Sequence, residues 1–373
     1  MPLFISGFRI WTSKPLPCII AQRIWAPAAG ICETIRRGNS SERQVFSTMT
    51  DLSVIVCTRN PRHSFLRRLL DSLRAQTLPK DRWELVFVDN ASDKKLAADW
   101  DLSWHPQARH VREEKLGLTP GRLRGIRETG SDIVVFFDDD NVPAADYLAS
   151  VCVICQQHPE LGTFGAGNIE PEFDVDPPAE IRPLLHKLAI RSVPSPRWSM
   201  EMNEFETVPW GIGLCVRRSV ADAYIEFVGS LDAAIPLDRT GGELYCGGDD
   251  MFSTIGVWAG SGFGIFPALR VTHLIPAERL TQPYFLKLIN DHAYSTFVRH
   301  YLCNGVQPQR VSAPRRFRAI LQGLKRGQFR MRCNFAALAG EDRAARFIVE
   351  RQLQPLAPLN LDDLVGTLPA NGR

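Results

Sequence analysis

Apolar runs with little alternation mark the strands that this sequence predicts. Runs of this kind cover residues 52–57, 83–88 and 133–137. Strands that are apolar on both faces are typical of a parallel sheet covered by helices on either side. Between the first two runs the apolar residues take the spacing of a helix, namely Phe65, Leu66, Leu69, Leu70 and Leu73. This alternation of strands and helices predicts a mostly parallel α/β sheet with right-handed connections.

Later segments extend this pattern and then depart from it. A shorter strand near residues 110–113 precedes a loop with Pro and Gly, which leads into a helix that ends near Gly130. Prolines and mixed charges at 171–209 predict a long, partly irregular connection. The apolar segment 263–269 predicts another strand, and residues 283–302 predict a long amphipathic helix.

These patterns divide the chain into three parts. We expect an α/β domain at 51–302, a basic helical C-terminal appendage at 303–373 and a poorly structured N-terminal extension at 1–50. The extension lacks alternation, and its apolar stretches are too short for a secretory signal peptide. Its acid-poor composition would suit a transit peptide, but Met49 stands just before the first strand and is favoured as the true start.

The composition is that of an ordinary globular protein, with 373 residues of which 45% are apolar and 23% charged. A net charge of +3 is too small to indicate a nucleic-acid partner. Nine scattered cysteines indicate a reducing compartment. No apolar run is long enough to span a membrane. We therefore expect a cytoplasmic protein that binds no nucleic acid.

Three carboxylates, Asp138–Asp140, follow directly after the apolar run 133–137. In parallel α/β sheets, ligands bind beyond the carboxyl ends of the strands, where these acids stand. Adjacent carboxylates repel one another unless a cation compensates them, and hard oxygen ligands suit Mg²⁺ or Mn²⁺ bound to a phosphate. The alternative is an acidic turn that closes the strand.

A dinucleotide-binding dehydrogenase is disfavoured by the segment after the first strand. Such an enzyme needs GxGxxG there, so that the backbone can approach the pyrophosphate. This chain has Thr58–Arg62 instead, without glycine. Any nucleotide is therefore expected to be held by side chains.

Five short motifs occur in an order that resembles family 2 glycosyltransferases of the GT-A fold. They are Val54–Asn60, Val88–Ser92, Gly121–Ile126, Asp138–Asp140 and Gly248–Asp250. The resemblance covers about residues 51–302. It implies a GT-A type α/β fold and transfer of a sugar from a nucleotide-diphosphate donor to an acceptor hydroxyl. It further implies inversion at the sugar and assistance by Mg²⁺ or Mn²⁺.

The resemblance also implies which residues bind the nucleotide sugar. Asp89 matches the carboxylate that reads the base, and Thr58 and Arg59 would line the same pocket. Arg122 matches an arginine near the base and diphosphate, although the family's Ala-Arg-Asn is here Gly121–Leu123. Polar turns at strand ends are the alternative interpretation for these residues.

Asp138 and Asp140 match the two acids of the family's DxD motif, with Asp139 between them at the nucleotide sugar. Asp138 would face the ribose or the metal, and Asp140 would bind the cation that bridges the diphosphate. A fixed cation stabilises the charge that develops on a diphosphate leaving group. His273 matches a further metal ligand of some relatives, and a structural histidine is the alternative.

Asp249 and Asp250 match the family's acidic pair near the acceptor. An inverting transfer needs one base for the acceptor hydroxyl, and Asp250 is the better candidate, although the two roles are exchangeable. Acids at a helix N-terminus, placed there by the helix dipole, are the alternative. Trp210 would stack on an acceptor sugar or pack in the core.

The last feature is a basic segment at 310–332, with eight Lys or Arg and no acid. Within it Phe317, Ile320, Leu321 and Leu324 recur at helical spacing. Packing of this stripe on the catalytic domain is the favoured interpretation. A cationic amphipathic helix also predicts loose attachment to anionic lipid at the inner face of the plasma membrane, where a lipid-linked acceptor would be presented.

Together these observations predict a metal-assisted inverting glycosyltransferase in bacterial polysaccharide or glycolipid synthesis, acting on a saccharide or lipid-linked acceptor. A sugar nucleotidyltransferase is the alternative within enzymes, but it would carry a glycine-rich phosphate loop after the first strand. An inactive scaffold with the same fold is the other alternative, and intact acids at both sites speak against it.

Overall fold

The computed structural model describes residues 50–356, with gaps at 203–204, 232–234, 236, 240–244 and 309–310. All described residues belong to the unit Thr48–Arg373. The predicted N-terminal extension, apart from Thr50, and the last seventeen residues, 357–373, lie outside the described part.

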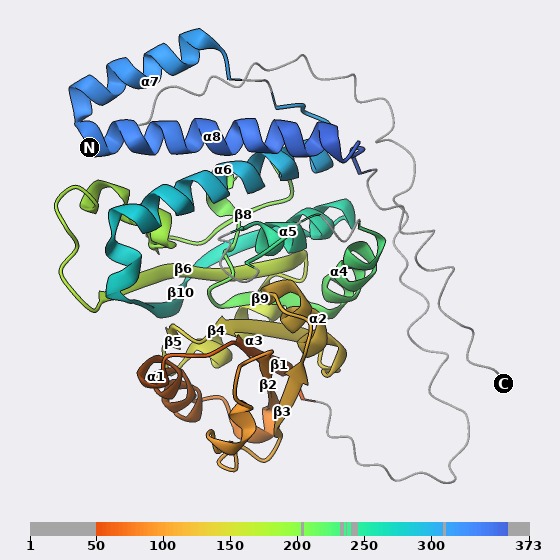
Figure 1. The fold of residues 1–373 in the computed structure, drawn as a ribbon. Coiled ribbons are helices and arrows are strands. Elements are labelled where there is room, and N and C mark those ends of the chain that lie inside the picture. The colour runs from red at the N-terminus through yellow and green to blue at the C-terminus, as the bar shows by residue number, and fades with distance from the viewer. Residues whose placement is uncertain are drawn as a thin grey trace, which may run out of the picture. The chain divides into compact units, whose positions relative to one another are not determined.

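One sheet of ten strands organises the described chain (Figure 1). Its main path runs in the order β3, β2, β1, β4, β9, β6, β10, β5, while β7 pairs with β6 and β8 with β10. The strands are β1 (Leu52–Thr58), β2 (Trp83–Asn90), β3 (Ala108–Glu113), β4 (Ile133–Asp138), β5 (Asn141–Pro143), β6 (Leu161–Phe173), β7 (Arg191–Ser192), β8 (Arg197–Ser199), β9 (Leu214–Arg217) and β10 (Gly262–Ile275).

Most of the strands run in one direction. β3, β2, β1 and β4 are mutually parallel, β9 is antiparallel to both β4 and β6, and β6 is parallel to β10. β6 and β10 therefore point the same way as β1 to β4. The predicted mostly parallel α/β sheet is confirmed.

Helices cover both faces of the sheet. The described helices are α1 (His63–Arg74), α2 (Leu118–Arg127), α3 (Tyr147–Gln157), α4 (Arg218–Ser230), α5 (Gly248–Trp258), α6 (Gln282–Asn304), α7 (Ala313–Arg326) and α8 (Gln328–Glu350), of which α1 to α5 pack against the sheet. Successive side chains of a strand point to opposite faces. Val54 and Val56 of β1 accordingly pack with residues of α1 and α3, whereas Ile55 packs with residues of α2, α4 and α5.

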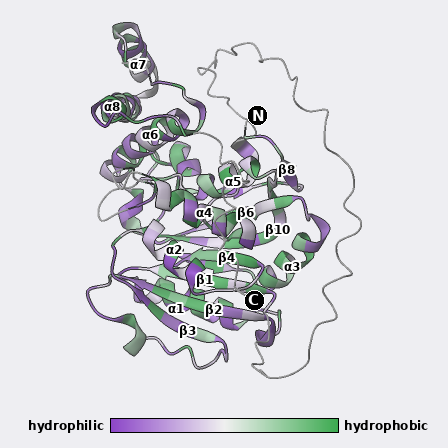
Figure 2. Cartoon of the chain, turned by 90° about the vertical axis from the view of Figure 1, so that its right-hand side faces the viewer, coloured by the Kyte–Doolittle hydropathy of each residue, from purple (hydrophilic) through white to green (hydrophobic). Residues whose placement is uncertain are grey.

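The core follows the apolar runs of the sequence. Every residue of β1 and β2 is buried, and Figure 2 shows the central strands coloured mostly hydrophobic. The predicted helix after β1 is α1, which buries the five apolar residues expected to form its inner face. The register pairs Cys57 with Asp138 and Thr58 with Asp89. The carboxyl ends of β1, β2 and β4 therefore meet at one edge of the sheet.

The connection predicted at 171–209 begins within β6, which ends at Phe173. The rest of the connection contains short elements. They include β7, β8 and the 3₁₀ helices η3 (Arg182–Leu188) and η4 (Phe205–Thr207). The predicted helix at 283–302 is confirmed as α6. Another 3₁₀ helix, η5 (Ala277–Leu280), connects β10 to α6.

The C-terminal helices stack beside α6, with α8 between α6 and α7 in both views (Figures 1 and 2). Cys333 of α8 packs with Phe285 and Ile289 of α6. Gly340 of α8 lies so close to α6 that a Cβ there would stand 2.2 Å from the carbonyl oxygen of Asn290. The two helices thus share a tightly packed interface.

Helix α7 turns its small residues inward and its large apolar residues outward. Ala319 is buried, whereas Phe317, Ile320 and Leu321 are 61%, 38% and 44% exposed. The favoured interpretation that this stripe packs on the catalytic domain is therefore wrong for these three residues, because α7 contacts α8 through its other face. Among the described residues, no helix combines the length and apolar character needed to cross a membrane.

Candidate functional site

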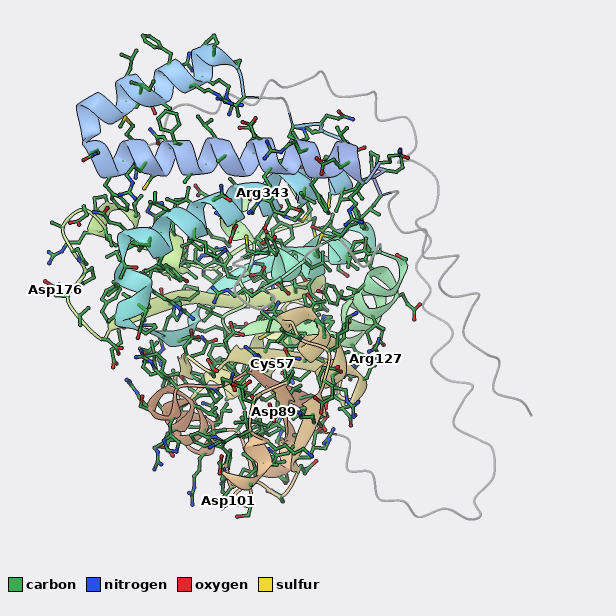
Figure 3. The ribbon with its side chains drawn as sticks, viewed as in Figure 1. Cys57, Asp89, Asp101, Arg127, Asp176 and Arg343 are labelled. Atoms are coloured by element: carbon green, nitrogen blue, oxygen red, sulfur yellow. The ribbon has the colours of Figure 1, made fainter. Side chains whose placement is uncertain are left out.

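A cavity of about 550 Å³ opens at the edge where β1 and β4 end. Nearly all of the residues that the sequence predicts as functional line it, with Asp89 as the exception. They are Thr58, Arg59, Arg122, Asp138, Asp139, Asp140, Trp210, Asp249, Asp250 and His273. In Figure 3, the labelled Cys57, another lining residue, lies well inside the ribbon, whereas Asp101 and Asp176 lie toward its periphery. The fold thus brings the predicted acids of β4 and α5 to one cavity.

The acids after β4 are held in a defined arrangement. Asn141 accepts a hydrogen bond from the backbone N–H of Asp138 at 3.0 Å and donates one to Asp140 at 2.7 Å. Arg279 of η5 lies 2.9 Å from the other oxygen of Asp140, and His273 Nε2 lies 3.5 Å from it. His273 reaches this place because β10 pairs with β5. Asp140 is therefore oriented from two directions.

Burial and mutual repulsion set the charge of these acids. Burial, with the negative charge of Asp140, raises the pKa of Asp139 to about 7, although Thr58 donates a hydrogen bond to its carboxylate. Burial also raises the pKa of Asp138. Burial acts on Asp140 in the same sense, but Arg279 and His273 outweigh it and hold the pKa of Asp140 well below its usual range. Negative charge at this edge is therefore only partly compensated.

The donor atoms at this edge suit a hard cation, although the described residues hold no ready-made group of three His, Cys, Asp or Glu for one. Asp138 and Asp140 line the same cavity and offer carboxylate oxygens, the ligands that Mg²⁺ and Mn²⁺ prefer. The raised pKa of Asp138 marks negative charge that a cation would stabilise. Nε2 of His273 lies 3.5 Å from Asp140 and adds a nitrogen donor atom to these oxygens. The chemistry of the donor set fits the cation.

The second pair of acids begins helix α5. Gly247 precedes the helix at φ 116°, a left-handed conformation that favours glycine. Asp249 accepts a hydrogen bond from the backbone N–H of Gly211 at 2.8 Å, and Asp250 forms an ion pair with Arg299 of α6 at 2.9 Å. Burial, together with the charge of Asp249, raises the pKa of Asp250 to about 6 against the effect of Arg299. A carboxylate with this pKa is ionised at neutral pH and close to the optimum for a general base.

Arg122 is engaged with protein groups. It forms an ion pair with Asp238 at 3.1 Å, and both side chains are buried. Thr119 donates a second hydrogen bond to Asp238 at 3.1 Å. A Cβ at Gly211 would stand 2.7 Å from the Arg122 guanidinium, so glycine is needed there to make room. Arg122 thus connects α2 to the segment between α4 and α5 at the cavity wall, next to Gly211.

Asp89 has different surroundings from those expected. Asp89 accepts hydrogen bonds from the backbone N–H groups of Ser92 and Leu96, and Arg112 lies 2.7 Å from it. Its neighbour Asn90, and not Asp89, lines the cavity. Its role at the base stays a prediction, and its oxygens are already engaged.

Trp210 lines the cavity and also packs against the main core cluster. The guanidinium of Arg191 lies 3.5 Å from the centroid of its ring. Arg191 therefore covers one face of the indole. An acceptor sugar would have to use the other face.

Comparison with known proteins finds a family match for part of the chain. Residues 53–179 match the family model Glycosyl transferase family 2. The chain carries a family 2 glycosyltransferase domain. The resemblance inferred from the motifs is thereby confirmed, and the matched segment includes Thr58, Arg59 and Asp138–Asp140.

The relatives of this chain are distant. The glycosyltransferase AglE of Haloferax volcanii is 28% identical over 105 residues, which cover 27% of this chain and 34% of AglE. This chain thus spans about a third of the length of the curated relative that it matches.

Two solved structures match this chain at lower sequence identity. TarS 1–349 of S. aureus is 14% identical with a TM-score of 0.44, over 82% of this chain and 92% of that one. The mannosyltransferase PcManGT of Pyrobaculum calidifontis, in complex with GDP-Man and Mn²⁺, is 19% identical with a TM-score of 0.47. That alignment covers 86% of this chain and 79% of PcManGT.

Several cavity residues lie outside the motifs. They include Lys187, Asp238, Arg279 and His292, and the neighbouring Arg299 pairs with Asp250. One signal was present in the sequence: His292 and Arg299 are seven residues apart and so share a face of α6. The others carry no spacing that distinguishes them from ordinary surface residues.

Proposed function

We propose that this chain transfers a sugar from a nucleoside-diphosphate donor to an acceptor hydroxyl with inversion at the anomeric carbon. The observation that supports the proposal best is the single cavity lined both by Asp138–Asp140 and by Asp249–Asp250. The first group suits a diphosphate with its cation, and the second suits a base beside the acceptor. The family 2 domain gives this pairing its chemical context.

The donor side of the proposal uses the residues at the ends of β1 and β4. Asp138 and Asp140, with His273, would hold Mg²⁺ or Mn²⁺, which stabilises the charge that develops on the leaving diphosphate. Thr58, Arg59 and Asn90 line the adjoining wall, where a nucleoside would lie. Arg279 keeps Asp140 in place through their 2.9 Å ion pair.

On the acceptor side, Asp250 would take the proton from the acceptor hydroxyl. The hydroxyl oxygen then bonds to the anomeric carbon while the bond from that carbon to the diphosphate oxygen breaks. A single displacement of this kind inverts the anomeric configuration. Arg299 holds Asp250, and the hydrogen bond from Gly211 to Asp249 fixes the start of α5 beside it.

Calorimetry tests the donor half of this proposal. UDP, GDP and dTDP are titrated into the protein with Mn²⁺, and again with a chelator in place of the metal. We expect one of the three nucleotides to bind, and to bind more tightly with Mn²⁺. Absence of binding by all three in the presence of Mn²⁺ would count against a nucleotide-sugar donor.

We also propose that α7 attaches the enzyme loosely to anionic lipid at the inner face of the plasma membrane, close to a lipid-linked acceptor in polysaccharide or glycolipid synthesis. Phe317, Ile320 and Leu321 are exposed. Arg318 between them has no ion pair within the described residues, while Arg315 is paired with Glu341. Apolar side chains beside free cationic charge are the combination that binds such a surface.

Sedimentation with vesicles tests the attachment. We expect the protein to pellet with phosphatidylglycerol-containing vesicles at low salt and to be released at high salt, because salt screens the attraction. Phe317→Ser combined with Leu321→Ser should leave the protein in the supernatant. The control Val349→Ser changes another exposed apolar residue, 69% exposed on α8, and should not. Equal behaviour of the two variants would contradict the role of α7.

A further inference from the structure

A cationic group in the cavity has no part in the proposed reaction. Lys187 of η3 lines the cavity together with its neighbour His186 and with His292 of α6. Lys187 is half-buried and forms no ion pair with a carboxylate among the described residues. We call Lys187, His186 and His292 the basic group. A cation without a counter-ion in a partly buried place is costly unless a ligand supplies the opposite charge.

Burial and neighbouring positive charges lower the pKa of each side chain in the basic group. Burial and the charge of Arg330 lower the pKa of Lys187. Burial and the charge of Lys187 also lower the pKa of His186, and burial with Lys187 and Arg299 lowers the pKa of His292 to about 4. Both imidazoles are therefore neutral at pH 7. Each can still donate one hydrogen bond, next to the three donors of a lysine ammonium.

The electrostatic contacts place His292 of the basic group near Asp249, the neighbour of the proposed base Asp250. The negative charge of Asp249 acts on His292 and raises its pKa, against the larger opposing effects. The charges that shift the pKa of Lys187 come from Arg330 and two thiols, and Asp138–Asp140 are not among them. The basic group thus lies on the side of Asp249 and not beside the acids that suit the donor diphosphate.

We propose that Lys187, His186 and His292 bind an anionic group, phosphate or carboxylate, carried by the sugar acceptor. This inference rests on the proposed function, whose substrate class it narrows. A lysine binds a phosphate or carboxylate as a compact point charge, and two neutral imidazole donors suit the remaining oxygens of the same anion. A neutral acceptor bound in the cavity would leave the charge of Lys187 uncompensated.

Ligand-observed NMR on the full chain tests this inference with three probes: glucose 6-phosphate, glucuronate and glucose. Each probe is titrated alone and again with saturating UDP or GDP and Mn²⁺. We expect at least one charged probe to bind more tightly than glucose and to remain bound when the nucleotide is added. Glucose 6-phosphate alone would identify a phosphate, and glucuronate alone a carboxylate.

Variants assign the binding to the basic group. Lys187→Ala should lower the affinity for the charged probe about tenfold, the effect of losing one charge-assisted hydrogen bond. Lys187→Arg, which keeps the charge, should retain most of the affinity. Lys94→Ala removes an exposed lysine that does not line the cavity and should change nothing. Thermal melting of each variant shows that it remains folded.

Three results would overturn the inference: equal binding of glucose and the charged probes, unchanged affinity in Lys187→Ala, or displacement of the probe by the nucleotide. Displacement would assign the basic group to the donor diphosphate. Nucleotide binding is measured separately by calorimetry. Its absence would count against the proposed function, while the probe titrations would still decide whether the basic group binds an anion.

Discussion

Removal of the positive charge beside Asp250 should shift the pH dependence of the reaction. The side chain of Arg299 lies 2.9 Å from the Asp250 carboxylate and lowers the pKa of Asp250, which burial and the charge of Asp249 otherwise raise. Arg299→Gln removes a cation that favours the ionised carboxylate. The pKa of Asp250 must then rise, and a reaction that needs the ionised base must lose activity at a higher pH than before.

The magnitude follows from the geometry of the ion pair. An arginine in direct contact lowers the pKa of a carboxyl group by about 1–3 units. The acid limb of the wild-type profile should have its midpoint near the Asp250 pKa of about 6. Arg299→Gln should move this midpoint to about 7–9. Arg299→Lys keeps the charge and should leave the midpoint close to that of the wild type.

The assay is the pH dependence of kcat/KM for hydrolysis of the donor, which needs no knowledge of the natural acceptor. This parameter reports the ionisations of the free enzyme. If the midpoint of Arg299→Gln stays in place or falls, the charge of Arg299 does not set the pKa of the catalytic base. A shift of equal size in Arg299→Lys would show that the effect comes from packing and not from charge.

Three further predictions concern single residues. Asp140→Ala should abolish the Mn²⁺-dependent part of nucleotide binding, because it removes a hard ligand; calorimetry with unchanged affinity would contradict this. Asp250→Asn should keep nucleotide affinity but lower turnover by about 10²–10⁴, and hydrolysis at the wild-type rate would exclude it as the base. Gly125→Ala would place a Cβ 2.4 Å from Ile55 and should cost about 1–3 kcal/mol in urea unfolding. Gly130→Ala, which meets nothing within 4 Å, is the control and should lose no stability.

Much of the sheet was predictable because its strands are apolar on both faces. β1, β2 and β4 carry nearly unbroken apolar runs, and such runs have few other stable arrangements. The insertion of β9 between β4 and β6 was not predictable in this way. Its four residues, Leu214–Arg217, carry no alternation that shows their direction, and their antiparallel pairing depends on contacts between distant parts of the chain.

In the candidate site too, local sequence predicts some residues, whereas contacts between distant parts of the chain determine others. Asp138, Asp140, Asp249 and Asp250 stand in short local motifs next to strand and helix ends, so the sequence was enough to select them. Their partners come from elsewhere in the chain. Arg279 and Arg299 reach the acids only because η5 and α6 pack beside the sheet.

Asp89 and α7 show why a local pattern is insufficient by itself. Arg112 and two backbone N–H groups occupy the oxygens of Asp89, and the contact with Arg112 depends on the pairing of β2 with β3. On α7 the apolar stripe predicted a buried face. Instead, the small residues Ala319 and Gly323 form the buried face of α7, because they allow closer packing against α8.

The central claim is an inverting transfer from a nucleotide sugar with Asp250 as the base. Proton NMR of the first sugar released during hydrolysis of an α-linked donor tests it most directly, since the anomeric coupling of that sugar records the stereochemistry before it equilibrates. We expect the β anomer to appear first and Asp250→Asn to suppress its formation. Release of the α anomer first, or equal release by the variant, would contradict it.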